Sequence, residues 1–385
     1  MNKTKVIFVS NVTLGYSSPK YLAFLKLLKK EHPTINIETH ERWDFSRKYY
    51  DIQGLDISRN IMSNWISKIG FKKNTILVKL IRRFSLIFSE LSLVLKVNQL
   101  SKRNRIILVT TFDSPFWGWL VKENITIVQN YSEVWQDDHK NSLSFLSDKL
   151  FSKLINKYRN RVDICIAPQE DRLKIAKGIY PYAEHFLVLN CPPKLEPSPS
   201  ITKDDNVKIL YQGVVGKHNY PVQLLKMLIH FSEKYEVHFA GRVDDSYIEL
   251  LEEAKSRDNF FYHGYLNQEQ LSELREKCNV GIVFWDESNL NTKYCAPNKL
   301  FEYISNGYYI LSCENHSLNN FNSLYKYGEH LPIKNYNCFL SSLNSQNFFD
   351  VRKNNLALHF KELNFAVQNE KLMERLKKHI CGLEE

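Results

Sequence analysis

The sequence predicts an α/β fold made of two Rossmann-like domains, each built on its own parallel sheet. The chain has 385 residues, about twice a common domain length, so two domains are expected. Short apolar runs alternate with helical patterns through both halves, which is typical of parallel strands joined by right-handed crossovers. A segment rich in proline and serine separates the two series.

The apolar runs of the first half read as buried strands, because helices on both faces of a parallel sheet leave no solvent-facing side. The first run, within MNKTKVIFVSN, is too short for an export signal and reads as the first strand. Strands are expected at residues 5–11, 35–40, 105–111, 125–130, 163–168 and 185–190, with a first helix near 19–30.

The most hydrophobic stretch, residues 76–97, predicts an amphipathic helix that cannot cross a membrane, because charged residues interrupt it. Its apolar side chains share one helical face: Leu77, Leu80, Ile81, Phe84, Phe88, Leu91 and Leu95. Lys79, Arg82 and Arg83 lie largely off that face. Two interpretations stay open: a helix of the domain core with a solvated edge, which we favour, or a helix resting on an anionic membrane surface.

Residues 191–205, CPPKLEPSPSITKDD, interrupt the pattern and read as a linker, because prolines resist both helix and central strand. A second series of strands is expected at 207–213, 235–241, 259–264, 279–285 and 308–313. The domains are therefore expected at residues 1–195 and 205–364. A final helix at about 365–385 is expected to pack back on the first domain.

The formal net charge of +10 requires an anionic partner or a tolerance of self-repulsion. Nucleic acid, an anionic membrane and a phosphate-bearing substrate would each satisfy it. Because the basic residues are dispersed among acids and no recognisable module is present, no nucleic acid partner is expected. Seven cysteines without a C-x-x-C pair, and no export signal, indicate a cytoplasmic protein.

A glycine turn follows the first strand of the second half, in ILYQGVVGKHNYP. Gly213 and Gly216 stand between a strand and a helix, where bare backbone and free N–H groups suit a phosphate. Lys217 and His218 would add positive charge there. The alternative is an ordinary tight turn, which also favours glycine.

The segment CAPNKLFEYISNG, residues 295–307, carries the stronger signal. Pro297 starts a helix on which Lys299 and Glu302 are three residues apart and therefore share a face. In this position the carboxylate can accept from both ribose hydroxyls of a nucleotide, while the ammonium meets the diphosphate. The alternative is a surface ion pair between the two side chains.

This segment resembles the helix-opening P-x-K-L-x-E-Y-x-x-x-G motif of bacterial glycosyltransferases with the GT-B fold, especially family 4 and its relatives. The resemblance continues over the ILYQG and HFAG turns and the stretch HGYLNQEQLSELREKCNVGIVFW, and is vaguer in the first half. It implies two Rossmann-like domains facing each other across a cleft. The first would bind the acceptor, and the second a UDP- or GDP-sugar donor.

By position, the resemblance implies that Glu302 holds the ribose and that Lys299 lies near the phosphates. The other implied donor-binding residues are Gly213, Gly216 and Lys217 at the diphosphate, Gly241 and Arg242 at the next strand end, Gly264, Tyr265 and Leu266 beside the base, and Asn298. Two departures leave the retaining or inverting outcome open. Tyr294 stands where many members carry a first glutamate, and no arginine is clear near Val215.

In the first half, loops that follow strands offer acceptor and catalytic residues. Gly15, Tyr16 and Ser17 are the candidates for the acceptor. An inverting transferase needs a base for the acceptor hydroxyl, and Glu133 is the first candidate and Asp113 the second. The alternative for Asp113 is a helix N-cap, a common role for Asp at strand ends.

Neither H-E-x-x-H nor D-x-D occurs in the sequence, so a metal-independent reaction without a cofactor is expected. Helix N-termini and Lys299 or Lys217 would then meet the charge of the leaving diphosphate. An NAD-dependent dehydrogenase is disfavoured, because no G-x-G-x-x-G follows a predicted strand.

These observations predict a glycosyltransferase that moves a sugar from a nucleotide-sugar to a glycan or lipid-linked glycan acceptor. The pathway would be that of a bacterial surface polysaccharide such as capsule or O-antigen. Contact with the inner membrane, as a peripheral protein, follows from the second interpretation of residues 76–97. The alternative function is a non-catalytic nucleotide-sugar-binding partner subunit of a glycosyltransferase complex, which would keep Glu302 without a working base.

Overall fold

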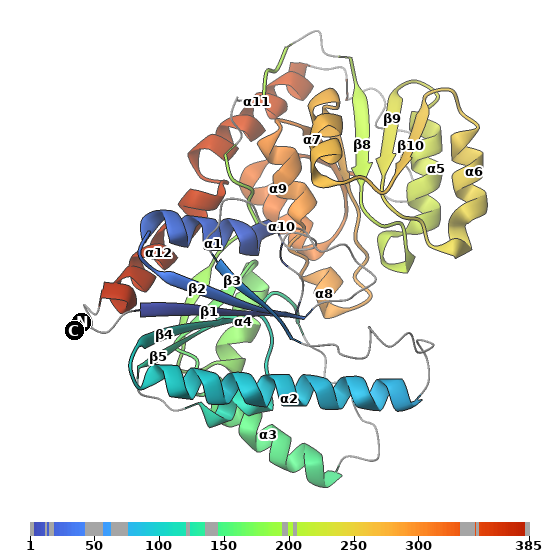
Figure 1. Ribbon diagram of the computed structural model, residues 1–385. Coiled ribbons are helices and arrows are strands. Elements are labelled where there is room, and N and C mark those ends of the chain that lie inside the picture. The colour runs from blue at the N-terminus through green and yellow to red at the C-terminus, as the bar shows by residue number, and fades with distance from the viewer. Residues whose placement is uncertain are drawn as a thin grey trace. The chain divides into compact units, whose positions relative to one another are not determined.

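The computed structural model of the chain (Figure 1) describes residues 4–11, 14, 19–42, 57–62, 76–120, 124–134, 145–194, 199–202, 206–331, 343 and 346–381. The chain divides into two compact units. Unit 1 comprises Met1–Val188 and Asn369–Glu385, and unit 2 comprises Leu189–Gln368. Each unit contains one parallel sheet, as the alternation of strands and helices predicts.

Unit 1 has a seven-stranded sheet with the order β3-β2-β1-β4-β5-β6-β7, in which every neighbouring pair is parallel. The strands are β1 (Thr4–Ser10), β2 (Asn36–Arg42), β3 (Ile57–Met62), β4 (Arg105–Thr110), β5 (Ile125–Asn130), β6 (Ile164–Ala167) and β7 (Glu184–Leu187). The order reverses between β1 and β4, which makes this the switch point of a doubly wound fold. β3 is absent from the strands that the sequence predicts.

The helices that accompany this sheet are α1 (Pro19–Glu31), α2 (Ile76–Ser101), the 3-10 helix η2 (Pro115–Trp119), α3 (Phe145–Arg159), α4 (Glu170–Ile179) and most of α12 (Phe365–Cys381). On α12, the Ile380 carbonyl accepts from Thr4 Oγ1 at 3.0 Å, and His379 Nδ1 lies 3.2 Å from Thr126 Oγ1. Arg375 donates to Glu184 at 2.6 Å. Because these partners stand at or near the start of their strands, the final helix lies at the amino ends of the unit 1 sheet.

Helix α2 packs on unit 1, but not through the apolar face that the sequence predicts. Phe84, Phe88 and Leu95 belong to the apolar face that was expected in the core, yet they are 59%, 71% and 70% exposed. The helix instead buries Val94 and Val97, with Leu93, on another side. Leu77, Leu80 and Ile81 have side chains outside the described residues. Among the described helices, none combines the length and hydropathy that a membrane crossing requires.

Unit 2 has a six-stranded parallel sheet with the order β10-β9-β8-β11-β12-β13. The strands are β8 (Lys208–Gln212), β9 (Glu236–Ala240), β10 (Phe260–Gly264), β11 (Val280–Val283), β12 (Tyr309–Cys313) and β13 (Gly328–Leu331). The switch point therefore lies between β8 and β11. β13, at the edge of the sheet, is again a strand that the sequence does not predict.

The helical elements of unit 2 are η3 (Lys217–Asn219), α5 (Pro221–Phe231), η4 (Asp245–Tyr247), α6 (Ile248–Lys255), α7 (Gln268–Lys277), α8 (Leu290–Lys293), α9 (Asn298–Ser305), α10 (His316–Tyr325) and α11 (Gln346–Lys361). Helices α5 and α6 lie side by side along the sheet (Figure 1). The four inner strands, β8, β9, β11 and β12, are almost completely buried, because the core of the unit is the sheet itself.

The described start of the expected linker belongs to unit 2. Asn190 donates to the Ala296 carbonyl at 2.9 Å, and the Pro192 carbonyl accepts from Phe365 N at 2.9 Å. Cys191, between them, is buried. The linker residues 195–198 and 203–205 lie outside the described residues.

Candidate functional site

Two glycines end neighbouring strands of unit 2 in backbone conformations that other residues rarely adopt. Gly213 follows β8 with a φ of +132°, and Gly241 follows β9 with a φ of +154°. Gly213 N donates to the Ala240 carbonyl at 2.8 Å, and a Cβ on Gly241 would lie 1.7 Å from the Gly213 carbonyl oxygen. Glycine is therefore required here, and it leaves bare backbone at the carboxyl end of β8, beside the switch point.

Lys299, on α9, lies directly against this glycine turn. A Cβ placed on Gly213 would be 2.6 Å from Lys299 Nζ. The ammonium also lies 4.9 Å from the ring centroid of Tyr211 and 5.4 Å from that of Trp285, both within reach of cation–π attraction. The fold thus brings together the two motifs that the sequence singles out more than 80 residues apart.

The environment of Lys299 changes its acidity. Burial lowers the pKa of Lys299 to about 8, and the negative charge of Glu302 opposes that shift. Burial disfavours the charged form because protein atoms replace the water that would solvate it. An anionic ligand beside this ammonium would therefore restore charge stabilisation that the free protein lacks.

Glu302 is held by residues from two other elements. The Glu302 carboxylate accepts a hydrogen bond from Gln212 Nε2 and lies 3.3 Å from Arg275 NH2. Arg275 Nε also donates to Gln212 Oε1 at 3.0 Å, which closes a network of three side chains. The alternative of an exposed ion pair between Lys299 and Glu302 is thus wrong: Glu302 is part-buried, and its ion pair is made with Arg275.

Arg275 is a residue that the sequence analysis missed. It lies near the end of α7, where a basic side chain is also expected for the helix dipole alone. Its position within the stretch that resembles the glycosyltransferases is the only signal that the sequence offers.

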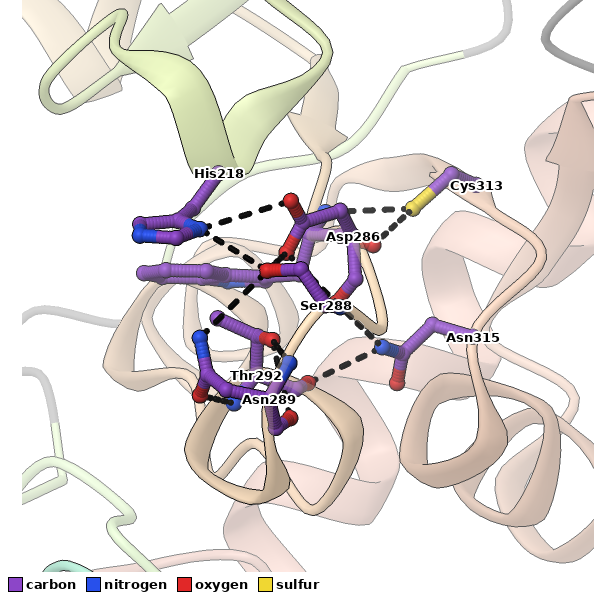
Figure 2. A network of polar contacts seen from close by, with 8 residues as sticks. His218, Asp286, Ser288, Asn289, Thr292, Cys313 and Asn315 are labelled. Carbon is purple, nitrogen blue, oxygen red and sulfur yellow. Dashed lines mark hydrogen bonds and ion pairs between the residues drawn. The ribbon is translucent and has the colours of Figure 1, made fainter. Parts of the chain in front are cut away.

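The loops after β8 and β11 are tied together by a polar network (Figure 2). His218 Nδ1 lies 3.0 Å from Ser288 Oγ and 3.4 Å from Asp286 Oδ2, and the Asp286 N–H donates to the His218 carbonyl at 2.9 Å. These contacts hold the glycine turn against the loop that precedes α8. The loops on the two sides of the switch point are therefore held together by hydrogen bonds.

A second part of the same network fixes Trp285, the residue whose ring Lys299 approaches. The Trp285 N–H donates to Cys313 Sγ at 3.1 Å, and the thiol is 3.2 Å from the Trp285 carbonyl, to which it donates. Burial raises the pKa of Cys313 to about 12, so the thiol keeps its proton. Asn315 donates to the Thr292 carbonyl at 3.0 Å and caps α10, as Figure 2 shows in part.

The other predicted donor-binding residues lie around the carboxyl ends of β8, β9 and β10 or at the start of α9. The Arg242 guanidinium lies 5.4 Å from the Tyr265 ring centroid, and both side chains are exposed. Gly264 ends β10 with a φ of +63°. The remaining positions are Gly216 before η3, Lys217 within it, Leu266 after β10 and Asn298 as the first residue of α9.

In unit 1, Asp113 is engaged in structural contacts. Its carboxylate accepts from Arg159 Nε at 2.7 Å and from the Tyr180 hydroxyl. The alternative role as an N-cap is wrong, because the N-cap of η2 is Ser114, whose side chain accepts from Phe116 N. These contacts link the loop after β4 to α3 and to the end of α4.

Glu133 is exposed in the loop after β5. Burial lowers the pKa of Lys20 and raises that of Tyr21; the negative charge of Glu133 opposes the first shift and adds to the second, so these side chains are its electrostatic neighbours. Gly15, Tyr16 and Ser17 lie outside the described residues. Within the described ranges, no group of three His, Cys, Asp or Glu side chains is arranged to hold a metal ion.

No protein-family model matches the chain, and no curated protein matches its sequence. Solved structures match its fold at low sequence identity. A glycosyltransferase from Rickettsia africae matches over 100% of both chains, with a TM-score of 0.64 and 12% identity. HepE from Anabaena, in complex with UDP, matches over 97% of this chain and 99% of that chain, with a TM-score of 0.62 and 11% identity.

A third match is WaaG, a glycosyltransferase involved in lipopolysaccharide biosynthesis. It covers 97% of this chain and 99% of that chain, with a TM-score of 0.61 and 10% identity. At these identities the matches establish the fold alone, which is the GT-B fold built from two Rossmann-like domains. The fold class predicted from the sequence is confirmed.

Proposed function

We propose that the protein is a glycosyltransferase, a relative of family 4, that binds a UDP- or GDP-sugar on unit 2. The observation that carries this proposal is the position of the Lys299 ammonium against Gly213, with Glu302 one helical turn further along α9. A cation beside bare backbone suits a diphosphate, and a fixed carboxylate nearby suits a ribose. The HepE structures, whose fold this chain shares, contain UDP and UDP-glucose.

In this proposal each donor-binding residue has a separate task. The Gly213 N–H is used within the unit 2 sheet, so Gly213 permits close approach while Lys299 supplies the charge. Two unit charges about 4 Å apart attract by about 4 kcal/mol at an effective dielectric constant near 20. Glu302 accepts from the ribose hydroxyls, and Gln212 and Arg275 hold its carboxylate in place.

We further propose that the reaction needs no metal ion or other cofactor. In that case Lys299, the exposed Lys217 and the N-terminus of α9 stabilise the charge that develops on the leaving diphosphate. Gly216, Gly241 and Arg242 line the diphosphate and sugar. The base lies against the loop that contains Gly264, Tyr265 and Leu266, and Asn298 completes the donor site.

Unit 1 is the proposed acceptor-binding domain. Glu133, exposed after β5, is the proposed base for the acceptor hydroxyl. Asp113 is assigned an anchoring role instead, because its carboxylate forms an ion pair with Arg159 and accepts a hydrogen bond from the Tyr180 hydroxyl. The proposed acceptor is a glycan or lipid-linked glycan of a surface polysaccharide, bound with help from Gly15, Tyr16 and Ser17.

Helix α2 supports the proposal that the protein works in the cytoplasm at the inner membrane surface. Phe84, Phe88 and Leu95 recur at helical spacing and are each more than half exposed. Burying one such aromatic side chain is worth about 1.5–3 kcal/mol, and the net charge of +10 favours an anionic surface. A lipid-linked acceptor would be found at that surface.

Binding of nucleoside diphosphates to the full chain tests the donor site. UDP or GDP should raise the free energy of unfolding, by about 2.7 kcal/mol at 100 times its Kd. Glu302→Gln keeps the side chain's shape and should weaken binding by about 10- to 100-fold, because hydrogen bonds to a charged acceptor are worth about 1.5–3 kcal/mol. Glu253→Gln, an exposed change on α6, is the matched control.

Because Glu302→Gln also removes the ion pair with Arg275, the Tm of the free variant is measured alongside its affinity. Unchanged affinity for every nucleoside diphosphate would refute the donor site. Sugar transfer from donor to acceptor then separates an enzyme from a non-catalytic binding subunit, since only the enzyme releases nucleoside diphosphate when both substrates are present.

A further inference from the structure

Two cations from different helices of unit 1 meet at a single residue, Ser132, in the loop after β5. Lys20, in the first turn of α1, donates from Nζ to Ser132 Oγ at 3.0 Å. Arg172, in the first turn of α4, donates from NH1 to the Ser132 carbonyl oxygen. These residues are far apart in the sequence, so the pair is a product of the fold.

Hydroxyl groups complete this cluster, which we call the Ser132 cluster: Lys20, Tyr21, Asn130, Ser132 and Arg172. The Tyr21 hydroxyl lies 2.9 Å from Ser132 Oγ, which in turn donates to Asn130 Oδ1 at 2.6 Å. Arg172 is only 7% exposed, whereas Lys20 and Ser132 are partly exposed. The Lys20 ammonium and the Ser132 hydroxyl thus lie close to a buried guanidinium.

The proximity of two positive charges has a measurable consequence in the free protein. Burial and the positive charge of Arg172 lower the pKa of Lys20 to about 7, and Glu133 opposes the shift. At neutral pH the ammonium is therefore only half protonated. A bound anion would favour the charged form, because it offsets both burial and repulsion between like charges.

We infer that the Ser132 cluster binds a phosphate group, with the Lys20 ammonium in contact with it and Arg172 adding charge from behind. Charge-assisted bonds from an ammonium to phosphate oxygens are among the strong hydrogen bonds in proteins. The cluster lies at the carboxyl ends of β5 and β6, one residue from Glu133. If the proposed function holds, the phosphate belongs to the acceptor, whose hydroxyl Glu133 would deprotonate.

Competitive acetylation of the folded full chain tests this site directly. At pH 7 a lysine with a pKa near 7 is about half neutral, whereas an ordinary lysine is neutral to less than about 0.1%. Lys20 should therefore react with acetic anhydride far faster than exposed Lys26 on the same helix, as read by peptide mass spectrometry. Inorganic phosphate should slow the reaction of Lys20 several-fold and leave Lys26 unchanged, with sodium chloride matching the ionic strength.

Three probes distinguish the source of the phosphate. Glucose 6-phosphate presents it on a soluble sugar, vesicles containing phosphatidic acid present it on a lipid, and unmodified glucose is the negative control. Protection of Lys20 by any of the phosphate-bearing probes supports the site, and the best probe identifies its source. Equal reactivity of Lys20 with and without all of them would overturn the inference.

A pair of variants separates this inference from the donor site. Lys20→Gln should raise the KM for a phosphorylated acceptor by about tenfold or more, while Lys26→Gln, the same substitution at an exposed lysine of the same helix, should not. UDP binding should be the same in both variants. A protein that binds UDP but leaves Lys20 unprotected by phosphate refutes only the phosphate site; protection without nucleotide binding refutes only the proposed function.

Discussion

Lys299 is the residue at which the structure predicts opposite effects on stability and on ligand binding. Replacing it with methionine keeps an unbranched side chain with a good helix propensity in α9 and removes a part-buried charge. The variant Lys299→Met should therefore unfold less readily than the wild type. It should also bind UDP or GDP more weakly, because the ammonium beside Gly213 is lost.

The magnitude follows from the pKa of Lys299, which falls from its ordinary value of 10.5 to about 8. At about 1.4 kcal/mol per pKa unit, the protonated lysine destabilises the folded state by about 3 kcal/mol at neutral pH. Partial exposure and the cation–π contacts with Tyr211 and Trp285, about 0.5–1 kcal/mol each, reduce the net effect. We expect Lys299→Met to raise the free energy of unfolding by about 1–2 kcal/mol at pH 7.

The pH dependence of stability independently tests whether the charge of Lys299 destabilises the folded state. Between pH 8 and 10.5 the unfolded chain still binds the proton that folded Lys299 has lost, so the stability of the wild type rises with pH in this window relative to the variant. The advantage of Lys299→Met should thus be full below pH 8 and shrink toward pH 10.5. Donor affinity of the wild type should fall over the same range above pH 8, because the ammonium loses its charge.

Urea unfolding at several pH values, together with UDP and GDP titrations, measures both effects. Lys226→Met, an exposed change on α5, is the control for surface charge. A wild type at least as stable as Lys299→Met at pH 7, with a difference that is constant up to pH 10, would refute the reasoning. So would a variant that binds nucleoside diphosphates with unchanged affinity.

Two further predictions concern the glycine turn and helix α2. Gly241→Ala should destabilise unit 2 by about 3 kcal/mol or more, because the added Cβ would clash with the backbone of Gly213. The control is Gly178→Ala in α4, where the added Cβ meets open space and the change should be neutral or slightly stabilising. Equal changes in Tm for the two variants would contradict this. Combined Phe84→Ser and Phe88→Ser should reduce flotation with anionic vesicles by about tenfold or more without lowering the Tm. Tyr182→Ser, at another exposed aromatic residue, is the control, and equal flotation of both variants would exclude membrane contact through α2.

Most strands of both sheets were predictable from the sequence. Eleven of the described strands were predicted, most of them from apolar runs, because a central parallel strand has both faces covered. The exception is β2, NIETHER, whose Glu38 and Glu41 are buried within the unit 1 sheet. The strands that were missed, β3 and β13, lie at sheet edges and read ISRNIM and GEHL; the other two edge strands, β7 and β10, were predicted. An edge strand has one neighbour only and tolerates polar residues, so its sequence carries little of the pattern.

The candidate site was also predictable from the sequence only in part. Spacing placed Lys299 and Glu302 on one helical face, because three residues bring side chains together on any α-helix. Nothing local indicated that Glu302 would pair with Arg275 or that the Phe84 and Phe88 face of α2 would be exposed. The sequence also carried no indication that Lys20 and Arg172 would both contact Ser132.

The sequence by itself thus determined the two sheets, the glycine turn and the helix that carries Lys299 and Glu302. Periodicity and backbone freedom are properties of neighbouring residues, and the sequence contains them directly. Only the tertiary structure decided which side chains from distant elements meet: Lys299 with Gly213, Glu302 with Arg275, and Lys20 with Arg172. Such contacts depend on how the chain brings strand ends and helices together, and no short stretch of sequence specifies that.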